Sequence, residues 1–205
     1  MTILKQLQTS QPVAFGGFSE LHVMDGKAVK ILEDACYADV LEECYRQNLA
    51  ADAGLAPRVH AVAKLVDEVV VVMDVIDTDT WFHADACDDV APTLLGELPL
   101  GQMADGLTLF AKLLKAGLIH ADFHTGNWFR NEAGDTLAID FGIASEINQA
   151  PEKHLKRAVQ FMLPALEQLG LDWMAEELVA AWQTDEDAVR KALVSVAQQV
   201  IDEDF

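Results

Sequence analysis

The chain has 205 residues, a length that suits one large domain or two small lobes, and 51% of them are apolar, enough to bury a substantial core. The 34 acidic residues outnumber the 14 basic ones, and the formal net charge of -20 argues against nucleic acid or an anionic lipid surface as a partner. No apolar run reaches the roughly 18 residues that a membrane-spanning helix needs, so no membrane span is expected.

The first residues and the cysteines indicate a cytoplasmic protein. The stretch MTILKQLQTSQPVAF lacks the charged-then-apolar pattern and the small-residue cleavage site of a secretory signal. Cys36, Cys44 and Cys87 are odd in number and scattered, which disfavours a disulfide framework or a zinc cluster. The alternative is an exported effector that needs no cleavable signal. The sequence predicts no particular oligomeric state.

Three short antiparallel strands are predicted near the start of the chain. They are expected at Val13–Phe15, Leu21–Met24 and Ala28–Leu32. The Asp25-Gly26 pair between the last two is a hairpin signal of the kind that needs positive φ. Lys30 lies within the third, otherwise apolar strand, where a lysine is costly unless a carboxylate or a phosphate neutralises it.

A helix is predicted over residues 34–53, followed by two strands. Side chains at helical spacing define the face expected to point inward: Leu41, Cys44, Tyr45, Asn48 and Leu49. Gly54 is expected to end this helix. Val59–Leu65 and the β-branched run Val69–Val72 are predicted strands, the second buried on both faces.

The second half of the chain is predicted to be mainly helical. Residues 77–101 are rich in Asp, Pro and Gly and are expected to form a linker and irregular structure. Helices are expected at Gln102–Ala116, after Pro151, at Leu171–Trp182 and at Glu186–Ile201. In the first of these, apolar side chains at helical spacing are expected to face inward: Met103, Leu107, Phe110 and Leu114. Pro164 should kink or interrupt the helix after Pro151. Trp173 and Trp182 are expected to pack in the core or between helices.

Polar side chains gather at the ends of short apolar segments between Gly117 and Gly142. Asp122, Asn127 and Asp140 each carry a side-chain oxygen, and strand ends are where a rigid sheet holds polar groups over a cleft. Two carboxylates and an amide that converge there suit a hard cation such as Mg²⁺, which prefers oxygen ligands.

These residues carry a resemblance to a known superfamily. The segment HADFHTGN over residues 120–127, followed by DFG over residues 140–142, resembles the catalytic loop and metal-binding motif of the protein-kinase-like superfamily. The order of these residues, the five-residue step from Asp122 to Asn127 and the thirteen-residue step from Asn127 to Asp140 are similar too. The resemblance is to a minimal atypical bacterial or phage kinase. The loop is also similar to those of aminoglycoside phosphotransferases and lipopolysaccharide-core kinases.

The resemblance implies an α+β, bilobal fold. Residues 1–76 would form an N-lobe with a small antiparallel sheet and one helix, and residues 77–205 a reduced, mainly α-helical C-lobe. The implied cofactors are ATP and Mg²⁺. Asp140 and Asn127 would bind metal, Lys30 would hold the α- and β-phosphates, and Asp122 would orient the acceptor hydroxyl and accept its proton.

Further residues would bind the nucleotide by the same resemblance. Gly16 and Gly17 look like a shortened glycine-rich loop, whose backbone N–H groups can approach phosphates closely. The helix over residues 34–53 would supply a glutamate partner for Lys30. Glu42 and Glu43 are both candidates, and Glu42 is preferred because it lies nearer the predicted apolar stripe. At the hinge, Met73 would line the adenine pocket, and the backbone of Asp74 and Ile76 would hydrogen-bond the base.

We expect an ATP- and Mg²⁺-dependent phosphotransferase, first a minimal serine/threonine protein kinase and alternatively a small-molecule or glycan kinase of the same fold. His124, where many protein kinases carry a lysine, favours the alternative. A non-catalytic nucleotide-binding protein is the least favoured hypothesis, because Lys30, Asp122, Asn127 and Asp140 are all present. Only eight residues separate Gly142 from Pro151, so the activation segment is very short.

Overall fold

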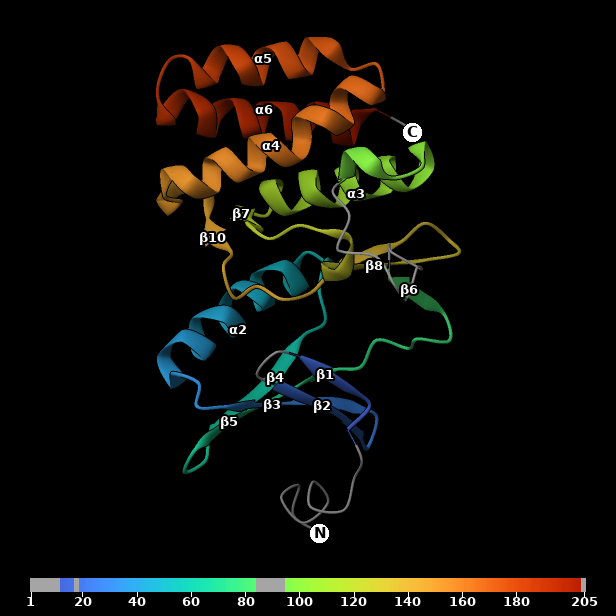
Figure 1. The fold of residues 1–205 in the computed structure, drawn as a ribbon, viewed down its shortest axis with the longest axis vertical. Coiled ribbons are helices and arrows are strands. Elements are labelled where there is room, and N and C mark those ends of the chain that lie inside the picture. Colours follow the sequence, from blue (N-terminus) through green and yellow to red (C-terminus); the bar gives the residue numbers. More distant parts are fainter. Residues whose placement is uncertain (1–11, 17–18, 84–94, 204–205) are drawn as a thin grey trace.

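The structure is a computed structural model, and it describes residues 12–16, 19–83 and 95–203. Its N-terminal part is a five-stranded antiparallel sheet with strand order β1-β2-β3-β5-β4 (Figure 1). The strands are β1 (Ala14–Gly16), β2 (Ser19–Met24), β3 (Lys27–Glu33), β4 (Val59–Lys64) and β5 (Glu68–Asp74). The predicted strands of this region are therefore confirmed.

The β2–β3 hairpin turns where the sequence predicted. Asp25 and Gly26 have φ angles of 50° and 72°, the backbone conformation that a two-residue hairpin requires. Strand β3 lies between β2 and β5, and Lys30 is opposite Leu21 on one side and Val71 on the other. Hydrogen-bond ladders on both sides thus fix the position of Lys30.

Helix α2 (Tyr37–Asp52) packs on this sheet with a face that differs from the predicted one. Its buried residues are Val40, Cys44, Gln47 and Ala50. Leu41 and Tyr45, which were expected inside, are 41% and 54% exposed, so that prediction was wrong. The helix is rotated because the Gln47 amide has hydrogen-bond partners inside, whereas the tyrosine hydroxyl remains at the surface. Gly54, with φ of 74°, follows the end of the helix as expected.

The C-terminal part is mainly helical. Its helices are α3 (Leu100–Lys115), α4 (Glu152–Gln168), α5 (Asp172–Trp182) and α6 (Glu186–Asp202), with short 3-10 turns η1 (Leu95–Glu97), η2 (Thr125–Asn127) and η3 (Ile147–Gln149). Strands β6 (Trp81–His83), β8 (Trp128–Asn131) and β9 (Thr136–Ala138) form one small sheet; β7 (Leu118–Ile119) and β10 (Ser145–Glu146) form another. Among the described residues, no helix is long and apolar enough to cross a membrane.

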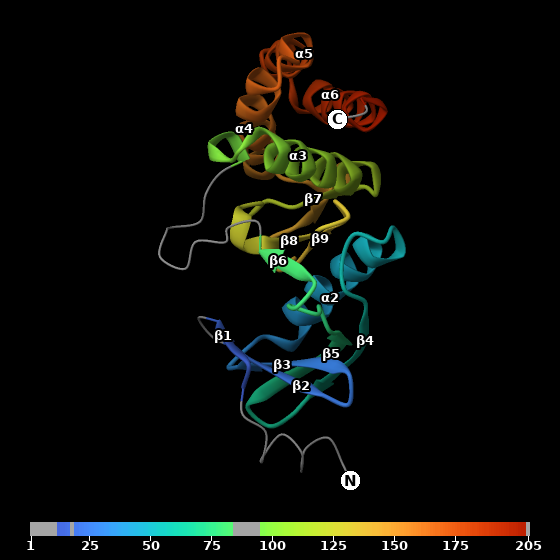
Figure 2. The same ribbon diagram turned by 90° about the vertical axis from the view of Figure 1, so that its right-hand side faces the viewer.

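The larger core lies in this helical part. Met103, Leu107, Phe110 and Leu114 of α3 are at most 1% exposed, which confirms the predicted inward face of that helix. Figure 2 shows the five-stranded sheet at one end, helices α3–α6 at the other, and the short strands β6–β9 between them. The Ala138 N–H donates to the Leu55 carbonyl at 2.8 Å, which ties β9 to the segment between α2 and β4.

The C-terminal part departs from the sequence-based expectations at three places. Part of the stretch predicted to be irregular forms β6, because it pairs with β8 in register Trp81 to Asn131. Helix α4 is not interrupted at Pro164, an exposed residue whose side chain lies close to Gly96 of η1. Trp173 and Trp182 are 51% and 37% exposed, because the inward side of α5 is occupied by Met174 and Leu178 instead.

Candidate active site

The loop between β7 and β8 is closed by its own side chains. His124 caps η2, since the Gly126 N–H donates to its Nδ1 at 3.1 Å. The Asn127 Nδ2 donates to the Asp122 carbonyl at 2.9 Å, and the Ile139 N–H donates to the Asn127 carbonyl at 2.9 Å. The loop that carries Asp122 and Asn127 is therefore fixed to the residue that precedes Asp140.

His120 is a buried packing residue beneath the loop. It is 1% exposed, its Nε2 lies 2.8 Å from the Ile139 carbonyl, and its ring packs edge-on against Phe123 and Phe141. Burial lowers the pKa of His120, so the ring is neutral and its Nε2–H donates to that carbonyl. His120 thus joins the loop of Asp122 to the segment of Asp140 without facing solvent.

Asp140 has an unusual backbone that projects its carboxylate. Its φ of 60° lies in the left-handed region, which non-glycine residues adopt at a cost, aspartate more readily than most, and such residues cluster at functional sites. The Gly142 N–H lies 3.4 Å from Oδ1 of Asp140, and the aspartate is exposed. The neighbouring Phe141 is fully buried, so the strain is held by packing.

Lys30 pairs with Glu43, so the preference for Glu42 as its partner was wrong. Lys30 Nζ lies 3.2 Å from Glu43 Oε1, and the two side chains are only 24% and 17% exposed. Glu42 is 68% exposed and pairs with Arg46 on the outer side of α2 at 2.8 Å. Glu43 follows Val40 by three residues and precedes Gln47 by four, so the rotation of α2 that buries these two also turns Glu43 inward.

The Lys30–Glu43 pair adjoins the Asp140 segment. A Cβ atom placed on Gly142 would lie 3.4 Å from Asp140 Oδ1 and 3.5 Å from Glu43 Oε2. The small sheet with α2 and the helical part thus bring a cation and two carboxylates to one place. Next to Glu43, burial and then the Glu43 charge raise the pKa of the Cys44 thiol to about 11, which keeps it protonated at neutral pH.

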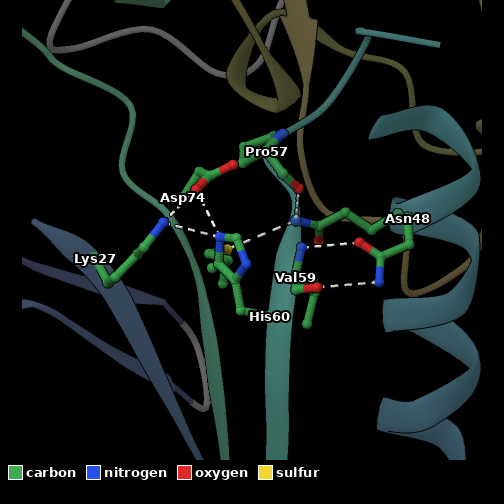
Figure 3. Close-up of polar contacts among 8 residues, drawn as sticks. Lys27, Asn48, Pro57, Val59, His60 and Asp74 are labelled. Carbon is green, nitrogen blue, oxygen red and sulfur yellow. Dashed lines mark hydrogen bonds and ion pairs between the residues drawn. The ribbon is translucent and has the colours of Figure 1, made fainter. Parts of the chain in front are cut away.

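The end of β5, where the sequence predicted a hinge, is anchored by side chains (Figure 3). Asp74 Oδ1 accepts from Lys27 Nζ at 2.7 Å and lies 2.7 Å from His60 Nε2. The hydrogen bond from Lys27, and then that from His60, lower the pKa of Asp74 to about 2. Met73 lies at the same strand end, with its sulfur 3.6 Å from the amide nitrogen of Gln47.

Two side-chain amides of α2 hydrogen-bond to the backbone just before and at the start of β4, as Figure 3 shows. Gln47 Nε2 donates to the Pro57 carbonyl at 2.7 Å. Asn48 pairs with both backbone groups of Val59: its Oδ1 accepts from the N–H at 2.8 Å, and its Nδ2 donates to the carbonyl at 3.2 Å. These contacts fix α2, and with it Glu43, relative to the sheet.

The remaining residues expected at the nucleotide site are Gly16, Gly17 and Ile76. Gly16 ends β1 opposite Ser19, whereas Gly17 lies outside the described residues. Ile76 follows β5 and is partly buried. In the described part of the chain, no group of three or more His, Cys, Asp or Glu side chains is arranged to hold a metal. A metal shared by Asp140, Asn127 and phosphate oxygens does not require such a group.

Several site residues were missed by sequence reasoning. Lys27 and His60, which hold Asp74, come from strands 33 residues apart and gave no local signal. The inward position of Glu43 did have a signal in the sequence. Val40, Cys44 and Gln47 also recur at helical spacing, and a glutamine can be buried when its amide is hydrogen-bonded.

Comparison with known proteins agrees with this geometry. The family model described as ABC1 atypical kinase-like domain matches residues 99–167, about a third of the chain, from α3 through the Asp122 loop and Asp140 into α4. The chain has a protein-kinase-like fold. No curated protein matches this sequence. The match supports a relationship of this chain to the protein-kinase-like superfamily and, in general terms, kinase-like activity. It identifies no substrate.

Proposed function

We propose that this protein is an ATP- and Mg²⁺-dependent phosphotransferase that transfers phosphoryl groups to an alcohol. One observation carries the proposal: the Lys30–Glu43 ion pair adjoins Asp140 across Gly142, beside the loop that carries Asp122 and Asn127. A lysine for phosphates, a carboxylate for metal and a second carboxylate near the acceptor are the groups that phosphoryl transfer uses.

The donor atoms present fit a nucleotide with its metal. Because the Asn127 Nδ2 donates to the Asp122 carbonyl, Oδ1 is the atom of this amide that would bind the metal. Asp140 supplies an exposed carboxylate. Bound Mg-ATP would supply the phosphoryl group and neutralise its charge. Lys30, oriented by Glu43, would hold the α- and β-phosphates, and the backbone at Asp74 and Ile76 would contact the base.

Asp122 would orient the acceptor hydroxyl and take its proton. Its side chain is 48% exposed, and its Oδ2 lies 3.8 Å from His124 Nε2. Since the Gly126 N–H donates to His124 Nδ1, a neutral His124 carries its proton on Nε2, the atom that faces Asp122. His124 would then hold the carboxylate in position and leave its other oxygen for the acceptor.

The acceptor is a serine or threonine of a protein in the first proposal and a small-molecule or glycan hydroxyl in the second. Two observations favour the second. His124 stands beside Asp122, and the segment after Gly142 is folded back on the helical lobe: Ser145 pairs with Ile119 in the β7–β10 sheet, and the Ile147 N–H donates to the Gly117 carbonyl at 2.8 Å. A segment held in this way offers little extended backbone to a peptide.

The test is transfer from labelled ATP in a cell lysate and to defined acceptors, with Asp122→Asn and the exposed-residue control Asp67→Asn. Because a positioned base contributes about 10²–10⁴-fold, Asp122→Asn should lose transfer by that factor and keep nucleotide binding. Label in protein bands supports the first acceptor class, and label only in small molecules or glycans supports the second. Full transfer by Asp122→Asn would refute the proposed catalytic role.

A further inference from the structure

The outer side of α4 and α5 carries exposed apolar side chains. Val179 and Trp182 of α5 are 43% and 37% exposed. Eight of the eleven residues of α5 are apolar, yet it lies at the outer end of the helical part (Figure 1) and buries only the side of Met174, Ala175 and Leu178. A helix that is apolar around most of its circumference is typical of one covered on more than one side.

Two hollows adjoin each other on this surface. The first, of about 230 Å³ between α4 and α5, is lined by apolar side chains such as Leu163 and Trp182. The second, of about 370 Å³, has the small residues Ala175 and Ala180 in its lining. Val179 lines both hollows, so together they form one continuous surface, which we call the α4–α5 face. Trp173 is two and a half turns from Trp182 on α5 and so lies on the other side of that helix.

Charge is distributed unequally along the α4–α5 face. Lys156 lines the first hollow, beside Trp182 at the end of α5. The second hollow, toward the start of α5, is lined by three carboxylates: Glu167, Asp172 and Glu176. The face therefore has one basic end and one acidic end, with apolar and small residues between them.

We infer that the α4–α5 face binds a second copy of this chain across a two-fold axis near Val179. A two-fold axis turns the face end for end, so that Lys156 of each copy meets the acidic end of the other. It also brings the Trp182 ring of each copy to the hollow that contains Ala175 and Ala180 in the other. A large aromatic against small residues, and one charge against its opposite, make the face complementary to itself.

The overall charge supports a specific contact of this kind. Two copies with a formal charge of -20 each repel one another at long range, so their association needs local complementarity. Among the residues lining the two hollows, Lys156 is the only cation, which makes its pairing the most sensitive part of the face. This inference does not depend on the proposed enzymatic function.

The test is the mass of the full chain by sedimentation equilibrium from about 5 to 200 µM, at roughly 0.15 M salt to screen the net charge. The wild type should reach twice the chain mass. Val179→Glu should remain monomeric, whereas Val194→Glu, which changes a 37% exposed valine on α6, should dimerise as the wild type does. A wild type that is monomeric at the highest concentration overturns the inference and leaves the face to another protein.

Charge reversal distinguishes this geometry from other dimers. Lys156→Glu and Glu176→Lys should each weaken self-association about tenfold or more, since each places like charges together. An equimolar mixture of these two variants restores both opposite-charge pairs, so it should form a heterodimer more tightly than either variant forms a homodimer. If the mixture associates no better than the single variants, the two-fold contact is wrong.

Discussion

Glu42 and Glu43 are adjacent in sequence and have different environments. Glu43 is mostly buried beside Lys30, and Glu42 is exposed beside Arg46. A partly buried ion pair costs desolvation, so its role is to hold Lys30 in one position rather than to add much stability. In our account, only Glu43 contributes to phosphate binding.

Glu43→Gln should therefore lower kcat/KM for ATP by roughly 10- to 100-fold, as expected when a charged hydrogen bond of about 1.5–3 kcal/mol is lost. Glu42→Gln is the matched control and should change kcat/KM less than about twofold, because Glu42 is exposed and pairs with Arg46 instead of Lys30. Steady-state kinetics on both variants measures this. Equal losses in the two would contradict the assignment of Glu43.

The lowered pKa of Asp74 predicts that the stability of the protein depends on pH. Its folded-state pKa of about 2 is below its ordinary value of 3.8, so the stabilisation it provides is present above about pH 4 and is lost as the pH falls toward 2. The stability difference between wild type and Asp74→Asn should therefore shrink over that range. Because Asp74 is half-exposed, the effect is small.

Urea unfolding at pH 5, 4 and 3 would measure this difference. Lys27→Met is the matching variant, because it removes the largest cause of the lowered pKa; it should move the loss of stability to higher pH. A difference that grows as the solution is acidified would show that Asp74 is not held as a carboxylate by Lys27 and His60.

The predicted site residues differ in whether the neighbouring sequence is enough to recognise them. Asp122, Asn127 and Asp140 follow one another within a single loop-and-strand segment, so their spacing was enough to propose them as one group. Glu43 was misjudged because the rotation of α2 is decided by contacts with Pro57 and Val59, which no periodicity shows.

At the scale of elements, α2 is fastened to the segment that leads into β4. Asn48 satisfies both backbone groups of Val59, and Gln47 contacts Pro57 and Met73. Since Gln47 is one turn after Glu43, these contacts join the hinge end of β5 to the lysine–glutamate pair. We expect α2 to keep one position whether or not nucleotide is bound.

Asn48→Ala should lower the free energy of unfolding by about 1–3 kcal/mol, because it leaves partly buried backbone groups without partners. It should also weaken ATP binding through the position of Glu43. Asn148→Ala, at an exposed residue of η3, is the control and should do neither. Denaturant unfolding and nucleotide titration would measure both effects; an Asn48→Ala variant that unfolds like the wild type would disprove the fastening role.

The order and kind of most elements were predictable, and their exceptions have physical causes. The hairpin at Asp25-Gly26 and the inward face of α3 followed from turn chemistry and regular apolar spacing. Strand β6 was missed because its stability comes from pairing with β8, far along the chain. The exposure of Trp182 was missed because α5 is apolar on most sides, and the composition does not show that Met174 and Leu178 take the inward one.

At the scale of the whole molecule, the proposed function depends on two parts meeting. The five-stranded sheet with α2 supplies Lys30 and Glu43, and the helical part supplies Asp122, Asn127 and Asp140. The two parts adjoin at Gly142, where an added Cβ atom would lie 3.5 Å from Glu43 Oε2. The superfamily resemblance predicted this division, and the fold agrees with it; the lobe boundary at residue 76 stays a prediction.

The most direct test of this account is calorimetric titration of ATP with and without Mg²⁺ into the wild type, Asp140→Asn and the surface control Asp67→Asn. We predict that Mg²⁺ strengthens ATP binding to the wild type and the control, and that Asp140→Asn loses this enhancement. If ATP binds the wild type no better with Mg²⁺, or if Asp140→Asn keeps the full enhancement, then Asp140 and Lys30 do not share a metal–nucleotide site and the central claim is wrong.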